Sequence, residues 1–282
     1  MLSYRHAFHA GNHADILKHY ALSLVLDYYN QKDKPYTVID THAGAGLYPI
    51  NHTFTQKNKE FETGVSQLLQ AKALPDSLAK FIQKIWLFNS SHSLNTYPGS
   101  PKITESFLRP SDKLYLFELH PNEYQNLLNN FKNSPNKQSK ILQQDGFKGL
   151  IAFLPPHTKR GIIIIDPPYE DKKDYENVIT ALKESLKRFA TGCYIVWYPL
   201  LQNKLYLPMV EALCELNSAN WLNVTLQVTQ PSADGYGMYG SGLFVINPPW
   251  TMPKLLEESL PVLEMLLGQD VSRAFELTYQ IS

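Results

Sequence analysis

Short apolar runs alternate with longer amphipathic stretches along most of this chain. Runs typical of β-strands occur at Tyr36–Asp40, Lys113–Glu118, Ile141–Gln144, Gly161–Ile165, Gly192–Trp197, Leu222–Val228 and Gly242–Ile246. A continuous run such as Ile162–Ile165 is typical of a strand that is buried on both faces of a parallel sheet. Helical periodicity separates several of these runs, for example at Glu123–Phe131 and Tyr175–Phe189. The alternation predicts a doubly wound α/β fold.

The N-terminal part of the chain predicts a helix from His13 to Asn30, with apolar residues at helical spacing. Asn12 can cap its first turn, and Asp15 suits the positive end of the helix dipole. A turn at Asp33–Pro35 then leads into the first strand.

The interval between the first two strands is too long for one crossover. The first run ends near residue 40 and the second begins near residue 113, whereas a parallel connection needs only about a dozen residues. Two helical patterns lie between them, Glu60–Ala71 and Asp76–Asn89, and Asp76 is placed as an N-cap. We therefore expect residues 50–95 to form an inserted helical subdomain, and residues 1–49 and 96–282 to form the main domain.

Composition excludes several classes of protein. The 282 residues carry 26 basic and 26 acidic side chains, which excludes binding to nucleic acid by bulk charge alone. The longest apolar stretch spans about nine residues, well short of the ~20 of a membrane helix, and no signal-peptide core is visible. Only two cysteines occur, which fits a reducing compartment. We expect a cytoplasmic protein without a membrane partner.

A glycine loop, Asp40–Gly46, follows the first strand. The dinucleotide fingerprint needs a third glycine, but Pro49 occupies that position, so a nucleotide pyrophosphate does not fit. S-adenosylmethionine (SAM) has no pyrophosphate, and Gly44 and Gly46 would let it lie close to the backbone. A plain turn between strand and helix is the alternative interpretation.

Acidic residues close the second and third strands as well. A carboxylate such as Glu118 can accept hydrogen bonds from both ribose hydroxyls of a bound nucleoside. Asp145 can accept from the exocyclic amine of an adenine ring, and Gly146 leaves space for that ring. Together with Asp40, these residues predict a SAM site at the carboxyl ends of the strands.

The most specific motif is Asp166-Pro167-Pro168-Tyr169, directly after the isoleucine strand. This pattern is the signature of methyltransferases that act on exocyclic amines of nucleobases. The Asp166 carboxylate and the Pro167 carbonyl can accept the two N–H groups of such an amine and aim its lone pair at the methyl group. Tyr169 would offer a face on which the flipped-out base stacks. A proline-rich turn without chemistry is the alternative.

A second, similar turn, Asn247-Pro248-Pro249-Trp250, follows the last apolar strand. Chain order favours the first turn, because the fourth strand of such a sheet lies beside the first strand, next to the cofactor. We therefore expect Asn247 to be structural.

The first nineteen residues are rich in polar and aromatic side chains, including His6, His9, His13 and His19. No cysteine or carboxylate pattern completes a zinc signature, so no metal is expected. Lys18 and His19 can instead donate to the carboxylate of SAM. Tyr4 and Phe8 provide stacking faces beside Arg5, as single-stranded RNA recognition requires.

The loop Gln230–Gly242 combines glycines with Tyr236, Met238 and Tyr239. It is either a mobile lid over the substrate or a long glycine-bearing hairpin.

The sequence resembles the bacterial 23S ribosomal RNA adenine-N6 methyltransferase J family over most of its length. The resemblance is carried by Met1–Asp15, Lys18-His19, Asp40–Gly46, Tyr97–Pro101, Glu118–Pro121, Asp145–Phe147, Ile165–Glu170, Arg188–Gly192 and Asn247–Trp250. It implies a Rossmann-like, class I SAM-dependent methyltransferase sheet with a small helical insertion after the first strand.

The resemblance also implies roles for individual residues. The cofactor site would comprise Lys18, His19, His42, Gly44, Ser100, Glu118, Asp145, Gly146 and Asp166. The catalytic residues would be Asp166, Pro167 and Tyr169, and the substrate RNA would contact Tyr4, Arg5, His6 and Tyr169. The expected reaction is SAM-dependent N6-methylation of a specific adenine in 23S ribosomal RNA by a monomer. A DNA adenine-N6 methyltransferase and a non-catalytic RNA-binding protein with a vestigial SAM pocket are the alternatives.

Overall fold

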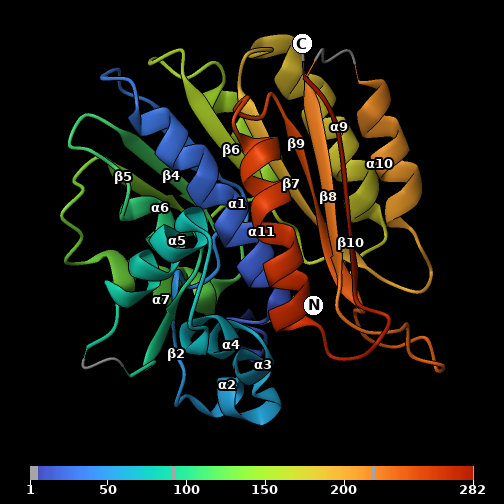
Figure 1. Ribbon diagram of the computed structural model, residues 1–282. Helices are drawn as coiled ribbons and strands as arrows, with labels where there is room; N and C mark the ends of the chain where they lie inside the picture. Colours follow the sequence, from blue (N-terminus) through green and yellow to red (C-terminus); the bar gives the residue numbers. More distant parts are fainter. Residues whose placement is uncertain (1–5, 91–92, 217–219, 282) are drawn as a thin grey trace.

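The structure is a computed structural model that describes residues 6–90, 93–216 and 220–281 (Figure 1). Its centre is an eight-stranded sheet with the strand order β10-β8-β9-β7-β6-β1-β4-β5. The strands are β1 (Thr37–Asp40), β4 (Lys113–Phe117), β5 (Ser139–Leu142), β6 (Gly161–Ile165), β7 (Cys193–Leu200), β8 (Trp221–Gln227), β9 (Gly240–Ile246) and β10 (Ala274–Gln280). All seven strands expected from the sequence are present, with ends shifted by a few residues.

The direction of the strands divides the sheet into two parts. Strands β5, β4, β1, β6 and β7 are parallel, whereas β9 is antiparallel to both β7 and β8, and β10 is antiparallel to β8. Strand β6 pairs with β1, and β9 lies beyond β7. This is the predicted Rossmann-like sheet, with β10 added at one edge.

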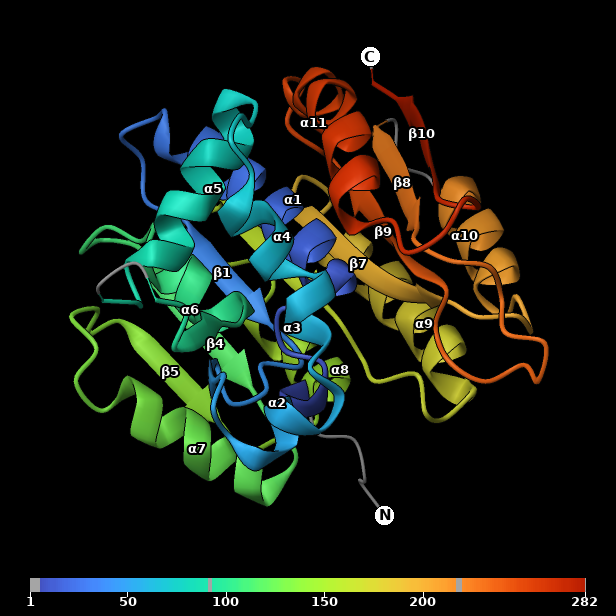
Figure 2. The ribbon, with the colours of Figure 1, turned by 60° about the horizontal axis from the view of Figure 1, so that its bottom comes forward.

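Helices cover both faces of the sheet (Figures 1 and 2). One face packs against α1 (His13–Asn30), α6 (Ser100–Glu105), α7 (Pro121–Phe131) and α11 (Met252–Leu267). The other face packs against α8 (Gly146–Leu150), α9 (Lys173–Arg188) and α10 (Tyr206–Glu215). Alternate isoleucines of β6 enter the two cores, Ile162 and Ile164 on the α1 side and Ile163 and Ile165 on the α9 side. Burial on both faces explains the uninterrupted apolar run.

Helix α1 has the bounds that the sequence predicted. The Asn12 side chain accepts a hydrogen bond from the Asp15 backbone N–H at 2.9 Å, which confirms the predicted cap. The first fourteen residues of the helix, His13–Leu26, are all buried, including its polar ones. The helix therefore runs through the interior and brings polar side chains to the edge of the sheet.

Among the described residues between β1 and β4, a small hairpin encloses four helices and is followed by α6. The hairpin pairs β2 (Leu47–Pro49) with β3 (Thr96–Pro98), and the helices between them are α2 (Thr53–Asn58), α3 (Glu60–Thr63), α4 (Val65–Gln70) and α5 (Asp76–Trp86). The prediction of one helix over Glu60–Ala71 is wrong, because Gly64 interrupts the helix and separates α3 from α4. A Cβ on Gly64 would lie 2.0 Å from the carbonyl oxygen of Gly11, so the two backbones meet there. Asp76 is also not the N-cap of α5; that position is Pro75.

Candidate active site

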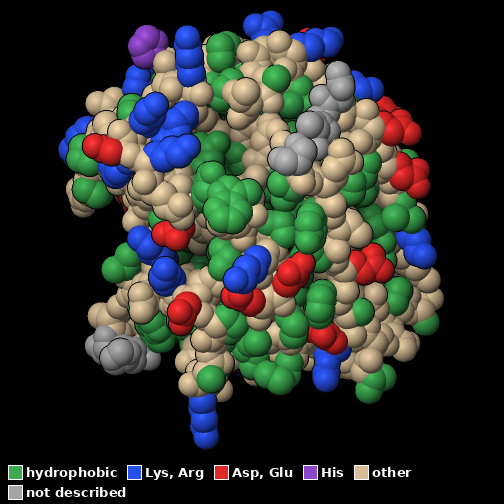
Figure 3. Space-filling view, turned by 45° about the horizontal axis from the view of Figure 1, so that its top comes forward, with side chains coloured by type: hydrophobic (Ala, Val, Ile, Leu, Met, Phe, Trp, Pro, Cys, Tyr) green, Lys and Arg blue, Asp and Glu red, His purple; other side chains and the backbone are tan. Residues whose placement is uncertain are grey.

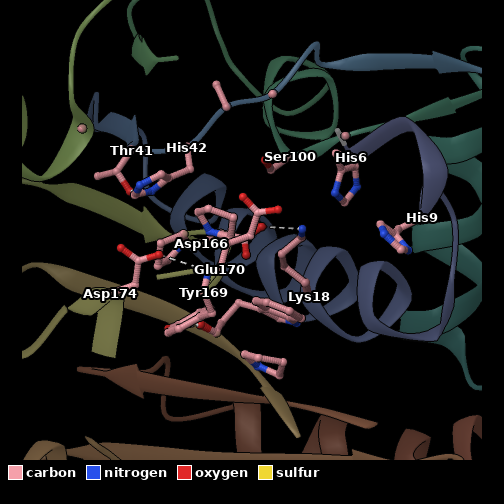
Figure 4. A pocket seen from close by; sticks show the side chains of 18 of the residues that line it. His6, His9, Lys18, Thr41, His42, Ser100, Asp166, Tyr169, Glu170 and Asp174 are labelled. Atoms are coloured by element: carbon pink, nitrogen blue, oxygen red, sulfur yellow. Dashed lines mark hydrogen bonds and ion pairs between the residues drawn. The ribbon is translucent and has the colours of Figure 1, made fainter. Parts of the chain in front are cut away.

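A cavity of about 720 Å³ opens at the carboxyl ends of the parallel strands. Figure 2 looks toward this end of the sheet, and Figure 4 shows part of the cavity wall. The wall is built by α1 and by the turns that follow β1, β4, β5 and β6, together with the end of β7. Ligands of open α/β sheets bind at this edge, so the predicted site residues meet where the topology requires.

Asp166 lies at the end of β6, and its side chain is 16% exposed to the cavity. The Lys18 ammonium nitrogen donates to Asp166 Oδ2 at 2.6 Å, as the dashed line in Figure 4 shows. A charge-assisted bond of this length fixes the carboxylate. Lys18, predicted as a donor to SAM, is therefore paired with the predicted catalytic carboxylate across 148 residues of sequence.

Tyr169 closes the same turn with a positive φ of 54°. Its backbone N–H donates to Asp174 at 3.1 Å, and its hydroxyl donates to the Trp197 carbonyl at 2.7 Å. The ring packs against Tyr175 and is only 7% exposed, whereas the neighbouring Trp197 is half-buried and also lines the cavity. Two aromatic side chains thus border the position next to Asp166.

Asp40 ends β1 deep beneath the cavity and is 1% exposed. The Ser100 hydroxyl donates to Asp40 Oδ2 at 2.7 Å, and the His42 backbone N–H donates to Oδ1 at 3.2 Å. Burial raises the pKa of Asp40 to about 6; the Ser100 hydrogen bond opposes this rise, and the charge of Asp166 adds to it. Ser100, predicted to bind SAM, thus joins the floor of the cavity through Asp40.

Glu118 follows β4 and folds back onto the glycine loop. Its carboxylate accepts from the Gly44 backbone N–H at 2.8 Å and from the His120 backbone N–H at 2.7 Å. Burial raises the pKa of Glu118, although these backbone N–H groups lower it. Gly44 has a φ of +60°, and a Cβ there would lie 2.3 Å from the Tyr48 hydroxyl, so the loop needs glycine.

Asp145 and Gly146 form the turn after β5. The Asp145 carboxylate caps α8 by accepting from the Phe147 and Lys148 backbone N–H groups at 3.0 and 3.3 Å. A Cβ on Gly146 would lie 1.9 Å from the Thr41 carbonyl oxygen, so this glycine also allows two strand ends to approach. The His42 ring packs edge-on against Phe147, and burial lowers the pKa of His42 to about 4.

Helix α1 contributes a buried polar group beside Asp166. The His19 ring nitrogen Nδ1 lies 2.8 Å from the Tyr97 hydroxyl, and burial lowers the pKa of His19 to about 3. Asp15 lies one turn earlier and forms an ion pair with Lys18 at 3.0 Å. The His6 ring lies 2.8 Å from the same carboxylate, which brings the N-terminal segment to the cavity.

The residues present fit a bound SAM molecule. The buried His19 Nε2 lines the cavity and has no hydrogen-bond partner among the described residues, so a polar group of a ligand can occupy that position. Gly44 and Gly146 allow close approaches that side chains would block. The carboxylates of Glu118 and Asp145 line the cavity and can accept hydrogen bonds from a ribose and from an adenine amine. The cavity thus offers acceptors for a ribose and for an exocyclic amine, both of which are parts of SAM.

The structure brings together every predicted site residue that it describes. Lys18, His19, His42, Gly44, Ser100, Glu118, Asp145, Gly146, Asp166, Pro167, Tyr169 and His6 all line the cavity. Tyr4 and Arg5, predicted to contact RNA, lie outside the described residues. Sequence reasoning missed Asp15, Asp174 and Trp197 as neighbours of the site. A polar residue one helical turn before Lys18 was the available signal for Asp15.

The described part of the chain contains neither a membrane-spanning helix nor a cluster of metal ligands. None of its helices combines the length and the apolar character that crossing a membrane requires. Within the same residues, no three histidine, cysteine or acidic side chains are grouped as ligands for a metal ion. Met238, from the loop between β8 and β9, reaches the cavity wall.

Comparison with known proteins assigns the chain to a family. Residues 33–278 match the family described as "Ribosomal RNA large subunit methyltransferase D, RlmJ". The chain belongs to this family. It is 42% identical to the Ribosomal RNA large subunit methyltransferase J of Escherichia coli (strain K12) over 267 residues, which are 95% of this chain and 94% of that protein. It is 41% identical to the protein of the same name from Haemophilus influenzae over 268 residues, with the same coverage.

A solved structure has the same fold. Protein LPL1258 from Legionella pneumophila superimposes with a TM-score of 0.89 and 35% identity, covering 96% of this chain and 98% of that one. Family membership confirms a SAM-dependent methyltransferase with a Rossmann-like sheet, as the sequence predicted. It speaks against a non-catalytic RNA-binding protein.

Proposed function

We propose that this protein transfers a methyl group from SAM to N6 of an adenine in 23S ribosomal RNA. The observation that carries the proposal is the Asp166 carboxylate, which ends β6 inside the cavity beside acceptors suited to the cofactor. The names of the relatives, which specify the large ribosomal subunit, support the choice of RNA.

The chemistry follows from the weak nucleophilicity of an exocyclic amine, whose lone pair is delocalised into the ring. The Asp166 carboxylate and the Pro167 carbonyl accept hydrogen bonds from the two N–H groups of the amine. This favours a tetrahedral nitrogen whose lone pair points toward the methyl group of SAM. The ion pair with Lys18 holds the carboxylate in one orientation. After transfer, Asp166 stabilises the positive nitrogen and accepts the displaced proton.

The other end of the cavity would hold the cofactor. Glu118 would accept from the ribose hydroxyls, Asp145 from the adenine amine, and His19 and His42 would contact the cofactor from α1 and from the loop after β1. Bound SAM supplies an electrophilic methyl group. The protein's contribution is to bind, orient and exclude water.

The substrate base would enter on the side of the N-terminal segment. His6 lines this side of the cavity, and we propose that Tyr4 and Arg5 contact the RNA beside it. Tyr169 and Trp197 border the position of the base, where an aromatic face can stack on an unpaired adenine.

The direct experiment measures methyl incorporation into protein-free 23S ribosomal RNA and into duplex DNA, with the Asp166→Ala variant as the inactive reference. Nuclease mapping should place N6-methyladenine at one position, and ribosomal RNA from cells lacking the protein should lack that methyl group. Incorporation into DNA alone would reject the RNA substrate, and methylation of another base would reject adenine.

We further propose that residues 50–95 form an inserted subdomain, since the β2–β3 hairpin joins the two ends of this segment. The enzyme would act as a monomer in the cytoplasm, where both cysteines remain thiols. Sedimentation at micromolar concentration tests the monomer.

A further inference from the structure

We propose that Asp15 is a positioning residue for methyl transfer, which acts by holding the Lys18 ammonium on one oxygen of Asp166. The other oxygen of Asp166 then accepts from the substrate amine. The inference deepens the proposed function and rests on it. Asp15 itself touches neither cofactor nor base in this scheme.

The Asp15 carboxylate is fixed independently of Lys18. It is 1% exposed, and its Oδ2 accepts from the Gly11 backbone N–H at 2.9 Å and lies 2.8 Å from the His6 ring. Burial would raise the pKa of Asp15, but the interactions with His6 and Lys18 outweigh it, and the pKa lies well below its usual range. A rigid, ionised carboxylate thus faces the neighbouring turn of α1.

Lys18 lies between two carboxylates. Its ammonium nitrogen is 3.0 Å from Asp15 Oδ1 and 2.6 Å from Asp166 Oδ2, and the residue is 5% exposed. Among the described residues, His19 on α1 and Asp40 at the end of β1 also interact with the charge of Lys18, and His6 shares the Asp15 carboxylate with it. A buried ammonium is costly unless it is paired, so the two carboxylates together keep Lys18 charged.

The arrangement restricts what Lys18 can do to Asp166. An ammonium attracted by Asp166 alone could move to contact both carboxylate oxygens and compete with the amine. Asp15 draws Lys18 toward α1, and the hydrogen bond from Lys18 to Asp166 is made to Oδ2. Asp15 therefore leaves Oδ1 of Asp166 as the acceptor for the base.

The decisive variant is Asp15→Asn, because the amide has nearly the same volume and keeps an oxygen for the Gly11 N–H. We expect its single-turnover rate to fall about tenfold or more, because Lys18 loses one of its two ion-pair partners, with SAM affinity within about twofold. Without the Asp15 charge, Lys18 loses its proton more readily, so the alkaline limb of the pH–rate profile should move to lower pH.

A double-mutant cycle separates positioning from folding. In a Lys18→Met background, Asp15→Asn should cause no further loss, because the lysine through which it acts is gone. Glu60→Gln is the matched control, because Glu60 bonds His9 and Asn12 at 2.9 Å in the same segment and takes no part in the two ion pairs of Lys18 described above. Its rate should equal that of the wild type.

Additive losses in the cycle, or an unchanged rate and pH profile in Asp15→Asn, would overturn the proposal. If Asp15→Asn does not fold, ¹⁵N-lysine spectra of the wild type decide, with Lys18 assigned from Lys18→Met. The proposal requires a Lys18 ammonium that stays protonated up to about pH 10, and deprotonation near neutral pH overturns it. If the wild type methylates no RNA, the proposed function fails, and these spectra still test the ion pairs.

Discussion

Two turns of this protein share one sequence pattern and occupy opposite ends of the same sheet. Asp166–Tyr169 follows β6 and Asn247–Trp250 follows β9, and both strands are fully buried. Each turn contains one non-glycine residue with positive φ, Tyr169 at 54° and Asn247 at 53°. The positive φ falls on the last residue of the first turn but on the first residue of the second, so the two turns share a sequence pattern and differ in backbone conformation. Only the first turn lines the cavity.

The surroundings of the two polar residues differ. The Asp166 carboxylate points into the cavity and is held by a cation. The Asn247 amide donates to the backbone carbonyls of Ala190 and Gly192 at 2.8 Å each, which ties β9 to the start of β7. The aromatic ends also differ, since Tyr169 is 7% exposed and Trp250 is 72% exposed. Figure 3 looks toward the Asn247 end, where hydrophobic side chains lie among basic and acidic ones.

Strand direction explains the difference. Strand β6 is parallel to β1, so its carboxyl end meets the glycine loop. Strand β9 is antiparallel to β7, so its carboxyl end lies at the amino end of β7. A four-residue motif acquires its chemistry from the end of the sheet on which it lies, which supports reading Asn247 as structural.

The largest expected effect is the loss of turnover in Asp166→Ala. Removing the acceptor and the charge together should slow single-turnover methyl transfer by about a hundredfold or more. The measurement is methyl transfer to RNA, normalised to folded protein, with Asn247→Ala as the comparison. An active Asp166→Ala beside an inactive Asn247→Ala would move the active site to β9.

Glu118→Ala tests whether only the Asp166 end of the sheet binds SAM. Losing the bonds to the ribose should weaken SAM binding by about 1 to 3 kcal/mol, measured by calorimetry. Glu184→Ala on the exposed face of α9 is the control and should bind normally. Unchanged affinity in Glu118→Ala would remove the ribose role.

Acid should destabilise the cavity end of the molecule through His13 and His19. Burial lowers their pKa values to about 4 and about 3, whereas the unfolded chain binds these protons near pH 6.5. Their contribution to stability is therefore full above pH 6.5 and is lost as the pH falls. Between pH 7 and pH 5, each of the two histidines should lower the free energy of unfolding by about 2 kcal/mol.

Asp40 acts in the opposite direction, because its pKa of about 6 is raised and its protonation favours the folded state. Urea unfolding at several pH values measures the sum. In His13→Gln, unfolding should take up one proton fewer, so the free energy of unfolding should depend less steeply on pH. Equal stability of the wild type at pH 5 and pH 7 would contradict the burial of neutral histidines.

Asn247→Ala should lower the free energy of unfolding by about 1 to 2 kcal/mol, through the lost hydrogen bonds and the strained positive φ. Asn247→Gly keeps the backbone freedom and should lose less. Urea denaturation distinguishes the two variants. A loss of RNA methylation per folded molecule in either one would refute a purely structural turn.

The smallest effects concern the aromatic ends of the turns. Tyr169→Phe removes one buried bond to the Trp197 carbonyl and should cost about 1 kcal/mol of stability. Trp250→Ala, at an exposed position, should change stability by less than about 0.5 kcal/mol. Thermal denaturation measures both losses of stability. A larger loss in Trp250→Ala than in Tyr169→Phe would mean that the Trp250 side chain makes stabilising contacts.

Local patterns predicted much of this architecture. The Asn12 cap marks the start of α1, and the run of isoleucines marks β6. Both signals lie in residues that are adjacent in the sequence. The acids at strand ends came together because parallel strands end at one edge of a sheet. The meeting of Glu118, Asp145 and Asp166 at one cavity could therefore be predicted from the sequence.

Contacts between distant segments could not be predicted in this way. The pairing of Lys18 with Asp166 depends on how α1 crosses the sheet. The break at Gly64 depends on the approach of the Gly11 backbone. Strand β10 was missed because most of its residues are exposed, so it has no apolar run and depends on pairing with β8.

The burial of α1 has a consequence for biosynthesis. The Tyr20 hydroxyl lies 2.6 Å from the hydroxyl of Ser259 on α11, 239 residues later in the chain. During translation, α1 therefore leaves the ribosome long before α11, which covers it, has been synthesised. Until then the apolar surface of α1 is not covered by α11. Contacts of such long range make folding slow and expose the nascent chain to aggregation. An enzyme proposed to modify ribosomal RNA thus depends on its own ribosome to finish nearly the whole chain before its first helix can be enclosed.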